Sequence, residues 1–532
     1  MPLTESYTPA TEEAPVVETT VGQLLRDAAA RWPDRTALIE ADVAGALGLR
    51  WTYAALRHEA ERLALALASR YAPGERICVW APNLPEWVIL EYAAALAGLT
   101  LVTANPAYQP RELKFVLEQS RSVGLFIAPA HRGNPMDAIA AGVAAQLPAL
   151  REVVDVTQVD QLFATGTANR GLPDVRPGDP AQIQYTSGTT GFPKGALLHH
   201  RGLITNAALT FARANVSEGE TVLNFMPMFH TSGCACLTLG AAQLGSPMII
   251  AALFDPGRML DIVEAERPAF VMGVPTMLVG LLEAQAARPR DLASVRMIVS
   301  GGAMVPPELV RRVREVFGCG FETVYGQTES SPVVTQTAAD DSLDDLCDTV
   351  GRALPQTEVS IRDPATGAVV PVGQVGEICA RGYLVMLGYN DNPDATQKAI
   401  DPEGWLHTGD LGTMDERGYV RVTGRVKEMI IRGGENLFPA EIENILLEHA
   451  DVAEVAVVGV PDERFGEVAT CFVRLVPGAD FDPAALKAHC RANLSAQKTP
   501  AHWIALPEWP LTGSGKIQKF VLRDRFVAGE FA

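Results

Sequence analysis

Positive charge is scarce in this 532-residue chain. It carries 44 lysines and arginines against 63 acidic residues, which gives a formal net charge of −19. This balance excludes a protein that holds nucleic acid through a general basic field, so no nucleic-acid partner is expected. It also means that an anionic small ligand must find its positive charge locally.

Cysteines and long apolar runs are scarce too. The eight cysteines are scattered, and only Cys234 and Cys236 lie close together, without the C-x2-C spacing of a metal site. This usage favours reduced thiols in a cytoplasmic protein. The N-terminus shows no apolar segment of a signal peptide. The most apolar stretch, residues 234–254, contains Gln243 and Pro247, so we expect core elements there and no transmembrane segment.

Strand-like and helix-like segments alternate along most of the chain. Runs typical of strands occupy residues 76–80, 99–103, 123–128, 181–185, 221–226, 246–251, 269–274 and 295–300, and helical patterns occupy residues 20–32, 85–98, 109–119 and 255–266. This alternation predicts an α/β fold with parallel sheets and crossover helices. Beyond residue 345, short strands without long helices predict a β-rich subdomain. The last stretch, about 105 residues from residue 425, is large enough to fold separately.

These patterns predict three parts. A loose N-terminal arm takes residues 1–19, and a large domain with mixed and parallel sheets and the β-rich subdomain takes residues 20–424. A small α+β C-terminal domain takes residues 425–532, with a helix at Pro439, strands 452–460 and 468–476, a helix at 482–494 and a last strand at 502–506.

The strongest chemical signal is the segment YTSGTTGFPKG at residues 185–195. Its glycines allow tight turns that bring backbone N–H groups close to a ligand, its hydroxyls add donors, and Lys194 adds a point charge suited to phosphate oxygens. It is not a Walker A loop, because Gly195 stands where that motif needs Ser or Thr. The composition predicts a phosphate-holding loop, with an ordinary Ser/Thr/Gly-rich surface turn as the alternative.

This segment resembles the signature loop of the adenylate-forming superfamily, which includes acyl-CoA synthetases, luciferases and peptide-synthetase adenylation domains. Seven further segments resemble the motifs of that superfamily in the same order: NFMPMFHTSG at 224–233, SGGA at 300–303, YGQTE at 325–329, WLHTGDLG at 405–412, GRVK at 424–427, RGGEN at 432–436 and LTGSGKIQK at 511–519. The resemblance extends from about residue 20 to about residue 525. It implies a large domain followed by a small, mobile C-terminal domain.

The resemblance implies a site for ATP. Residues expected at the nucleotide are Thr186, Ser187, Gly188, Thr189, Thr190, Gly191, Lys194, Gly301, Gly302, Ala303, Tyr325, Gly326, Gln327, Thr328, Asp410, Arg425 and Lys516. By resemblance, Tyr325 stacks on adenine, Thr328 contacts the α-phosphate and Asp410 accepts hydrogen bonds from the ribose hydroxyls. Glu329, with Thr190, is expected to hold Mg2+, a hard cation that prefers oxygen ligands.

The resemblance also implies catalytic and domain-motion roles. The expected catalytic residues are Lys516, His230, Thr328 and Lys194. Lys427 stands at the hinge, where many relatives carry Asp, and Gly433 and Gly434 belong to a loop that lines the channel for the pantetheine arm of CoA. From residue 497 to 525, five basic residues face two acids, which predicts local attraction for ATP around Lys516.

The function implied is that of an AMP-forming acyl-CoA synthetase, a ligase of fatty acid metabolism. A carboxylic acid would be joined to AMP with release of pyrophosphate and then transferred to CoA. Amino-acid-activating relatives carry an aspartate at the position of His230, so its absence argues against amino acids, whose buried ammonium would be unpaired. Small residues at Gly233, Cys234, Ala235 and Cys236 predict room for a medium- to long-chain acyl group.

Several alternatives remain open at this point. An aryl or branched acid fits the same motifs, and so does an acyl-AMP ligase that loads a carrier protein, although no extra insertion precedes Arg425. A luciferase-like oxidoreductase shares the scaffold. A non-catalytic binder is disfavoured because Lys194, Glu329, Asp410 and Lys516 are all present. Homodimer formation and peripheral membrane contact are also open.

Overall fold

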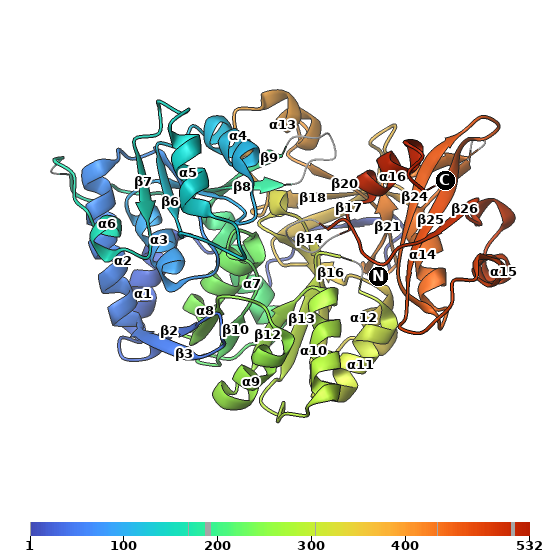
Figure 1. Ribbon diagram of the computed structural model, residues 1–532, viewed down its shortest axis with the longest axis horizontal. Helices are drawn as coiled ribbons and strands as arrows, with labels where there is room; N and C mark the ends of the chain where they lie inside the picture. The colour runs from blue at the N-terminus through green and yellow to red at the C-terminus, as the bar shows by residue number, and fades with distance from the viewer. Residues whose placement is uncertain are drawn as a thin grey trace. The chain divides into compact units, whose positions relative to one another are not determined.

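The computed structural model describes residues 2–168, 170–186, 193–303, 305–432, 435–511 and 517–531. The chain forms two compact units (Figure 1). The larger unit comprises Thr8–Val359 and Ala380–Leu406, and the smaller unit comprises Met1–Tyr7, Ser360–Cys379 and His407–Ala532. The predictions for Ser187, Gly188, Thr189, Thr190, Gly191, Gly433, Gly434 and Lys516 lie outside the described residues.

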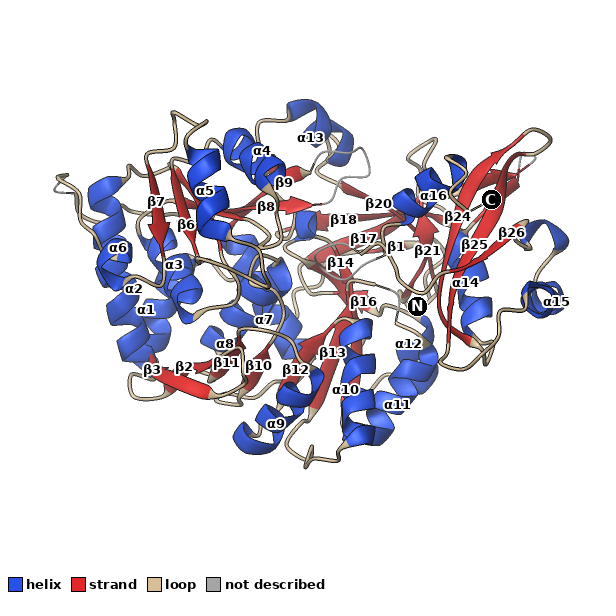
Figure 2. Ribbon diagram, viewed as in Figure 1, coloured by secondary structure: helices blue, strands red, loops and turns tan. Residues whose placement is uncertain are grey.

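The larger unit contains a mixed sheet of nine strands. Their order is β16 (Arg352–Ala353), β15 (Val333–Gln336), β14 (Gly320–Gly326), β13 (Met297–Gly301), β12 (Phe270–Gly273), β10 (Val222–Asn224), β11 (Met248–Ala251), β2 (Thr36–Ala41) and β3 (Leu47–Thr52). The strands from β14 to β2 are parallel, and the pairs are antiparallel at the two ends, with β15 and β16 at one end and β3 at the other. Helices flank these strands (Figure 2), as expected for an α/β fold.

A second sheet of the larger unit has seven strands. Their order is β19 (Gly388–Tyr389), β9 (Lys194–His199), β8 (Pro180–Thr186), β5 (Thr100–Thr103), β4 (Arg76–Trp80), β6 (Gly124–Ile127) and β7 (Glu152–Asp155). The strand β4 shows why such segments form strands. Ile77 to Trp80 are all fully buried, and a continuous apolar run is typical of a parallel strand that is covered on both faces.

Several helices of the larger unit begin at a side chain that caps them. Thr20 accepts a hydrogen bond from the Gln23 amide, Thr52 from the Ala55 amide and Asp255 from the Arg258 amide. The helices are α1 (Val21–Arg31), α2 (Tyr53–Arg70), α3 (Pro85–Leu96), α4 (Pro110–Ser120), α5 (Met136–Ala144), α6 (Val159–Leu162), α7 (His200–Arg213), η1 (Ser232–Leu237), α8 (Thr238–Gln243), α9 (Pro256–Glu266), α10 (Pro275–Ala287), α11 (Pro307–Phe317), η2 (Thr328–Ser330), α12 (Leu343–Asp348) and α13 (Pro393–Ala399).

The smaller unit contains strands of two further sheets. One sheet has the order β1 (Tyr7–Thr8), β17 (Thr357–Arg362), β18 (Gly376–Gly382), β20 (Leu406–Met414) and β21 (Val420–Arg425), and the chain passes between the two units within several of these strands. A further sheet contains β23 (Glu435–Leu437), β22 (Ile430–Arg432), β25 (Gly466–Leu475), β24 (Val452–Asp462) and β26 (His502–Ala505). Antiparallel pairs join β20 to β21, β22 to β23 and β25, and β24 to β25 in the smaller unit, whereas β26 pairs parallel with β25. Helical segments here are α14 (Pro439–Leu447), α15 (Pro483–Asn493), η3 (Ala496–Lys498) and α16 (Lys519–Val527).

The predicted α/β class and nearly all of the predicted elements are confirmed. One difference concerns the N-terminal arm, which is not loose. The Ser6 side chain is buried and its hydroxyl donates to the Pro371 carbonyl, and the Thr11 carbonyl accepts from the Gln356 amide. Backbone hydrogen bonds therefore fix a segment whose composition suggested disorder. Among the described helices, none is both long enough and apolar enough to cross a membrane.

Candidate active site

The predicted adenine-binding residues lie at the ends of two neighbouring strands. In the parallel pair β13 and β14, Gly301 pairs with Val324, so residues after Gly301 and residues after Val324 emerge at the same sheet edge. A Cβ on Gly301 would collide with the Val324 carbonyl, and Gly302 has φ +76°, which favours glycine. The carboxyl ends of parallel strands are the usual ligand site of such sheets.

Tyr325 and Gly326 end β14, and further buried residues follow them. Tyr325 is 9% exposed, and Gly326 approaches the Pro332 carbonyl so closely that no Cβ fits. Gln327 precedes η2, whose first two residues, Thr328 and Glu329, are each 7% exposed. Ala303, in contrast, is exposed at the surface.

Glu329 is connected to Lys194 through an aromatic residue that the sequence did not single out. The Tyr389 hydroxyl donates to Glu329 Oε1 at 2.7 Å, and the Lys194 ammonium lies 4.9 Å from the centre of the Tyr389 ring. Burial, together with the nearby Glu329 charge, raises the pKa of Tyr389, so its hydroxyl remains a donor. Three elements, β9, β19 and η2, thus bring an ammonium, a phenol and a carboxylate together.

A pocket of about 210 Å³ opens beside Lys194. Its lining comprises Phe115, Gln119, Pro193, Lys194, Gly195, Tyr389, Asn390 and Asn392. Lys194 is the first residue of β9 and pairs with Thr186, the last residue of antiparallel β8. The predicted phosphate loop therefore connects the two strands of a hairpin, whereas a Walker loop connects a strand to a helix. The Thr186 hydroxyl lies 3.5 Å from the Lys194 carbonyl oxygen.

His230 lies beside a π-helix, η1, which the sequence did not predict. Its Nδ1 is 3.2 Å from the Ser232 hydroxyl, and its carbonyl accepts from Cys234 Sγ at 3.4 Å. π-Helical turns occur frequently at functional sites. A Cβ on Gly233 would collide with the Pro227 carbonyl, so the small size of this residue permits close backbone packing. The expectation that the small residues leave room for an acyl chain is therefore not supported at Gly233.

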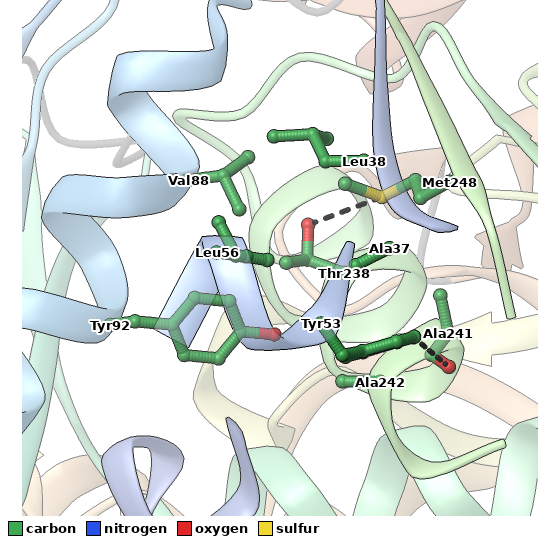
Figure 3. A pocket seen from close by; sticks show the side chains of 10 residues that line it. All are labelled: Ala37, Leu38, Tyr53, Leu56, Val88, Tyr92, Thr238, Ala241, Ala242 and Met248. Carbon is green, nitrogen blue, oxygen red and sulfur yellow. Dashed lines mark hydrogen bonds between the residues drawn. The ribbon is translucent and has the colours of Figure 1, made fainter. Parts of the chain in front are cut away.

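The larger unit also has a small cavity lined by residues of α2, α3, α8, β2 and β11, shown in Figure 3. Tyr53 and Tyr92 lie in its wall with Thr238, and the Tyr53 hydroxyl donates to the Ser246 carbonyl at 2.9 Å. Its volume of about 10 Å³ suits roughly one water molecule. The cavity is too small for an acyl chain.

In the smaller unit, Asp410 and Arg425 form an ion pair. They face each other in the antiparallel strands β20 and β21, with Arg425 Nε 2.9 Å from Asp410 Oδ1. Asp410 is 5% exposed, whereas the Arg425 side chain is 50% exposed. The Thr408 hydroxyl accepts from the Asp410 amide at 3.1 Å and donates to the Ile378 carbonyl at 2.7 Å, which fixes the backbone at Asp410.

Glu377 supports the same part of β20. Its Oε1 accepts from the Gly409 amide at 2.9 Å, and its Oε2 lies 2.8 Å from His407 Nδ1. Hydrogen bonds with Cys379 and with Glu377 raise the pKa of the His407 imidazole to about 10. Burial raises the pKa of the Cys379 thiol. Gly409 has φ +73°, a conformation that glycine adopts without strain.

Lys427, the predicted hinge, is exposed in the turn after β21. The amides of Glu428 and Met429 both donate to the Arg425 carbonyl, so this turn is hydrogen-bonded in the structure. Further along, Lys519 lies 2.7 Å from Glu443 and 3.4 Å from Glu428. The ion pair with Glu428 links the start of α16 to the residue that follows the predicted hinge.

The predicted basic patch near the C-terminus is largely neutralised by ion pairing. Four of its basic residues pair with acids elsewhere in the smaller unit: Lys498 with Glu441, Lys519 with Glu443, Arg523 with Glu467 and Arg525 with Glu530. The expected local attraction for ATP is therefore weaker than the linear sequence indicated, because the partner acids lie outside the counted segment. A count of charged residues along the sequence omits the acidic residues that folding places beside the basic ones.

Comparisons with known proteins agree with these motifs. The AMP-binding enzyme family model matches residues 25–390, and the AMP-binding enzyme C-terminal domain matches residues 441–516. YngI of Bacillus subtilis, named a "putative acyl-CoA synthetase", is 37% identical over 97% of this chain and 98% of its own length. The human mitochondrial medium-chain acyl-CoA ligase ACSF2 is 35% identical over 95% of this chain and 87% of its own.

A solved structure extends the likeness to three dimensions. ATP-bound MatB from Rhodopseudomonas palustris superposes with a TM-score of 0.84 at 30% identity, over 96% of this chain and 99% of its own. That similarity spans both the sheets of the larger unit and the C-terminal part of the chain. The chain therefore belongs to the AMP-binding enzymes, the adenylate-forming superfamily that its motifs resemble.

Proposed function

We propose that this protein is an AMP-forming acyl-CoA synthetase that activates a medium- to long-chain fatty acid. The acid carboxylate attacks the α-phosphate of ATP, pyrophosphate leaves, and the resulting acyl-adenylate is attacked by the thiol of CoA with release of AMP. The names of YngI and ACSF2 support the acyl-CoA product, and that of ACSF2 supports a medium-chain acid. Neither name suggests a carrier protein or oxygen as the acceptor, so those alternatives are not favoured.

The observation that carries the proposal is the arrangement of Lys194, Tyr389 and Glu329 beside the pocket of about 210 Å³. In the first half-reaction two anions must approach each other, so positive charge is needed where negative charge accumulates. Lys194 provides an ammonium at that pocket, and its Tyr389 contact restrains the long side chain. Restraint before binding lowers the entropy that the substrate complex must lose.

The residues at this site fit a magnesium ion. Glu329 offers a carboxylate that is 7% exposed, and hard oxygen donors of this kind suit Mg2+, which usually shares its coordination with phosphates. A bound Mg2+ would supply positive charge next to the ATP phosphates. Tyr389 would orient Glu329 for that task through its 2.7 Å hydrogen bond.

The other predicted site residues would have different roles in nucleotide binding and catalysis. Tyr325 would stack on adenine, Thr328 would contact the α-phosphate, and Asp410 would bind the ribose hydroxyls. Lys516 would bring a second ammonium to the α-phosphate in the first half-reaction. Turning the C-terminal domain, residues 425–532, about Lys427 would then withdraw Lys516 and present Gly433 and Gly434 to the pantetheine arm.

The test combines ATP, Mg2+ and a series of saturated carboxylic acids of increasing length, with and without CoA. Pyrophosphate release and the acyl product are followed together by mass spectrometry. We expect acyl-CoA from medium- or long-chain acids. Acyl-adenylate that accumulates whether or not CoA is present would contradict the proposal.

The Lys516→Ala variant separates the two half-reactions. We expect acid-dependent ATP–pyrophosphate exchange to fall at least about 100-fold, because a charge that stabilises the transition state is removed. Thioester formation from supplied acyl-adenylate and CoA should change less than about fivefold. Lys487→Ala, at an exposed position on α15, serves as the control. Equal loss of both half-reactions would contradict the role of Lys516.

A further inference from the structure

The smaller unit contains a cluster of three different metal-binding side chains that the proposed reaction does not use. Glu377 and Cys379 are two residues apart on β18, so their side chains point to the same face of the sheet. His407 extends from the neighbouring strand β20. One ligand atom from each residue, a carboxylate oxygen, a sulfur and an imidazole nitrogen, lies within 4.8 Å of both others.

The spacing of these atoms is close to that of a tetrahedral zinc site. His407 Nδ1 is 2.8 Å from Glu377 Oε2 and 3.6 Å from Cys379 Sγ. Bonds of about 2.0–2.3 Å in a tetrahedral site hold neighbouring ligand atoms roughly 3.3–3.8 Å apart. Small side-chain rotations, without backbone movement, are therefore enough to surround an ion.

The surroundings of the cluster suit a metal that enters from one side. Cys379 is fully buried, whereas the side chains of Glu377 and His407 are 13% and 27% exposed. Two ligands thus reach solvent while the sulfur lies beneath them, which leaves a fourth position for water. A thiolate and an imidazole select Zn2+ over Mg2+, because Mg2+ prefers oxygen ligands alone.

We propose that Glu377, Cys379 and His407 bind a zinc ion, and that this ion reversibly inhibits the enzyme. Binding releases the Cys379 thiol proton, and the imidazole proton of His407, to the solvent. The site is separate from the magnesium site proposed at Glu329, both in its residues and in its preferred metal.

Inhibition follows from the second oxygen of Glu377. Oε1 of Glu377 holds the Gly409 amide at 2.9 Å, and Gly409 directly precedes Asp410. When Glu377 and His407 turn toward the ion, Gly409 loses or shifts this support, and the Asp410 carboxylate moves with it. This inhibitory consequence rests on the proposed nucleotide-binding role of Asp410, whereas metal binding itself does not.

The binding test uses full-length protein stripped of metal, in buffer with millimolar Mg2+, titrated with Co2+ as a spectroscopic probe. A thiolate-bound tetrahedral Co2+ gives a near-ultraviolet sulfur-to-cobalt band and strong visible bands. We expect one equivalent of this signal, displaced by Zn2+, in the wild type and in the Cys347→Ala control. Cys347 is a half-buried cysteine on α12. In Cys379→Ala the sulfur band should disappear and affinity should fall more than about tenfold.

A second variant, His407→Gln, covers the case in which Cys379→Ala fails to fold. It should also lose the tetrahedral spectrum, with folding checked by circular dichroism. A wild type without the sulfur-to-cobalt band, or a Cys379→Ala protein that retains it, would overturn the proposed site.

The inhibition test measures acid-dependent ATP–pyrophosphate exchange with and without micromolar Zn2+. We expect at least a fivefold loss in the wild type and in Cys347→Ala, and less than a twofold loss in Cys379→Ala. Equal inhibition of all three proteins would overturn the inhibitory part of the proposal. A wild type that shows no acid-dependent exchange refutes the proposed function instead, and the cobalt spectrum then decides the metal site.

Discussion

Replacing Glu322 with Gln is expected to stabilise the protein at alkaline pH. Glu322 lies on β14 with its side chain fully buried, and its Oε2 accepts from Gln336 Nε2 at 2.6 Å. Oε1 has no hydrogen-bond partner among the described residues. Burial raises the pKa of Glu322 from 4.5 to about 8, although Gln336 and Arg213 lower it in part and Asp340 and Asp341 add to the increase. At neutral pH the folded protein therefore holds a proton that the unfolded chain releases.

The sign and size of the effect follow from proton linkage. Below pH 4.5 Glu322 is protonated in both states, and between pH 4.5 and 8 only the folded state holds the proton. The free energy of unfolding therefore falls as pH rises in this window, by about 1.4 kcal/mol per pH unit. From pH 5.5 to 8 the loss reaches at most about 3.5 kcal/mol. For a unit of roughly 380 residues, with an unfolding entropy near 0.8 kcal/mol/K, this equals about 4 °C in Tm.

The assay compares the Tm of the wild type and of Glu322→Gln by scanning fluorimetry from pH 5.5 to 8.5. Gln cannot ionise, so the Tm of the variant minus that of the wild type should rise by up to about 4 °C across this range. Glu315→Gln, at an exposed position on α11, should show a constant difference and serves as the control. A difference for Glu322→Gln that is equally constant would refute the reasoning.

Two further substitutions test contacts on which the proposed site depends. Tyr389→Phe removes the 2.7 Å hydrogen bond to Glu329 but keeps the ring near the lysine, so kcat/KM for acid-dependent pyrophosphate exchange should fall about 10- to 100-fold; an unchanged value would contradict the orienting role. Lys519→Met leaves Glu443, which is 7% exposed, without its cation and should destabilise the smaller unit by about 2–4 kcal/mol in urea unfolding. The control Lys498→Met removes a more exposed pair and should cost less than about 1 kcal/mol; equal losses would contradict the argument from burial.

Local features of the fold could be predicted from the sequence because local chemistry determines them. Thr20 caps the helix that corresponds to the predicted pattern at residues 20–32, and the apolar run at residues 76–80 is a strand with the predicted bounds. The π-helix η1 was not predicted from the sequence, and the close approach of Gly233 to the Pro227 carbonyl within it is a tertiary contact that no local pattern signals. The order of the N-terminal arm was not predictable either, because the hydrogen bonds of Ser6 and Thr11 involve residues more than 300 positions away.

The candidate site was predictable only as a series of motifs. Glu329 and Lys194 stand in recognisable segments, but Tyr389, which contacts both, lies in no segment that the sequence marked for chemistry. A single aromatic residue after Gly388 carries no spacing signal, so only tertiary structure reveals its role. The domain boundary at residue 425 stays a prediction. The smaller compact unit starts this part of the chain earlier, as His407–Ala532, and it includes Ser360–Cys379 as well.

The carboxylates proposed to bind the ribose and Mg2+, Asp410 and Glu329, already have internal partners, and this affects how the site can bind its ligands. Asp410 accepts from Arg425, and Glu329 accepts from Tyr389, although both side chains are less than 9% exposed. A buried carboxylate without a donor would be costly, so these contacts stabilise the site before any ligand arrives. One carboxylate can accept about four hydrogen bonds, so an internal donor and a ligand can share it. Ribose hydroxyls at Asp410 and a cation at Glu329 can therefore add to the existing contacts. The internal hydrogen bonds then hold both carboxylates in place while the ligands bind.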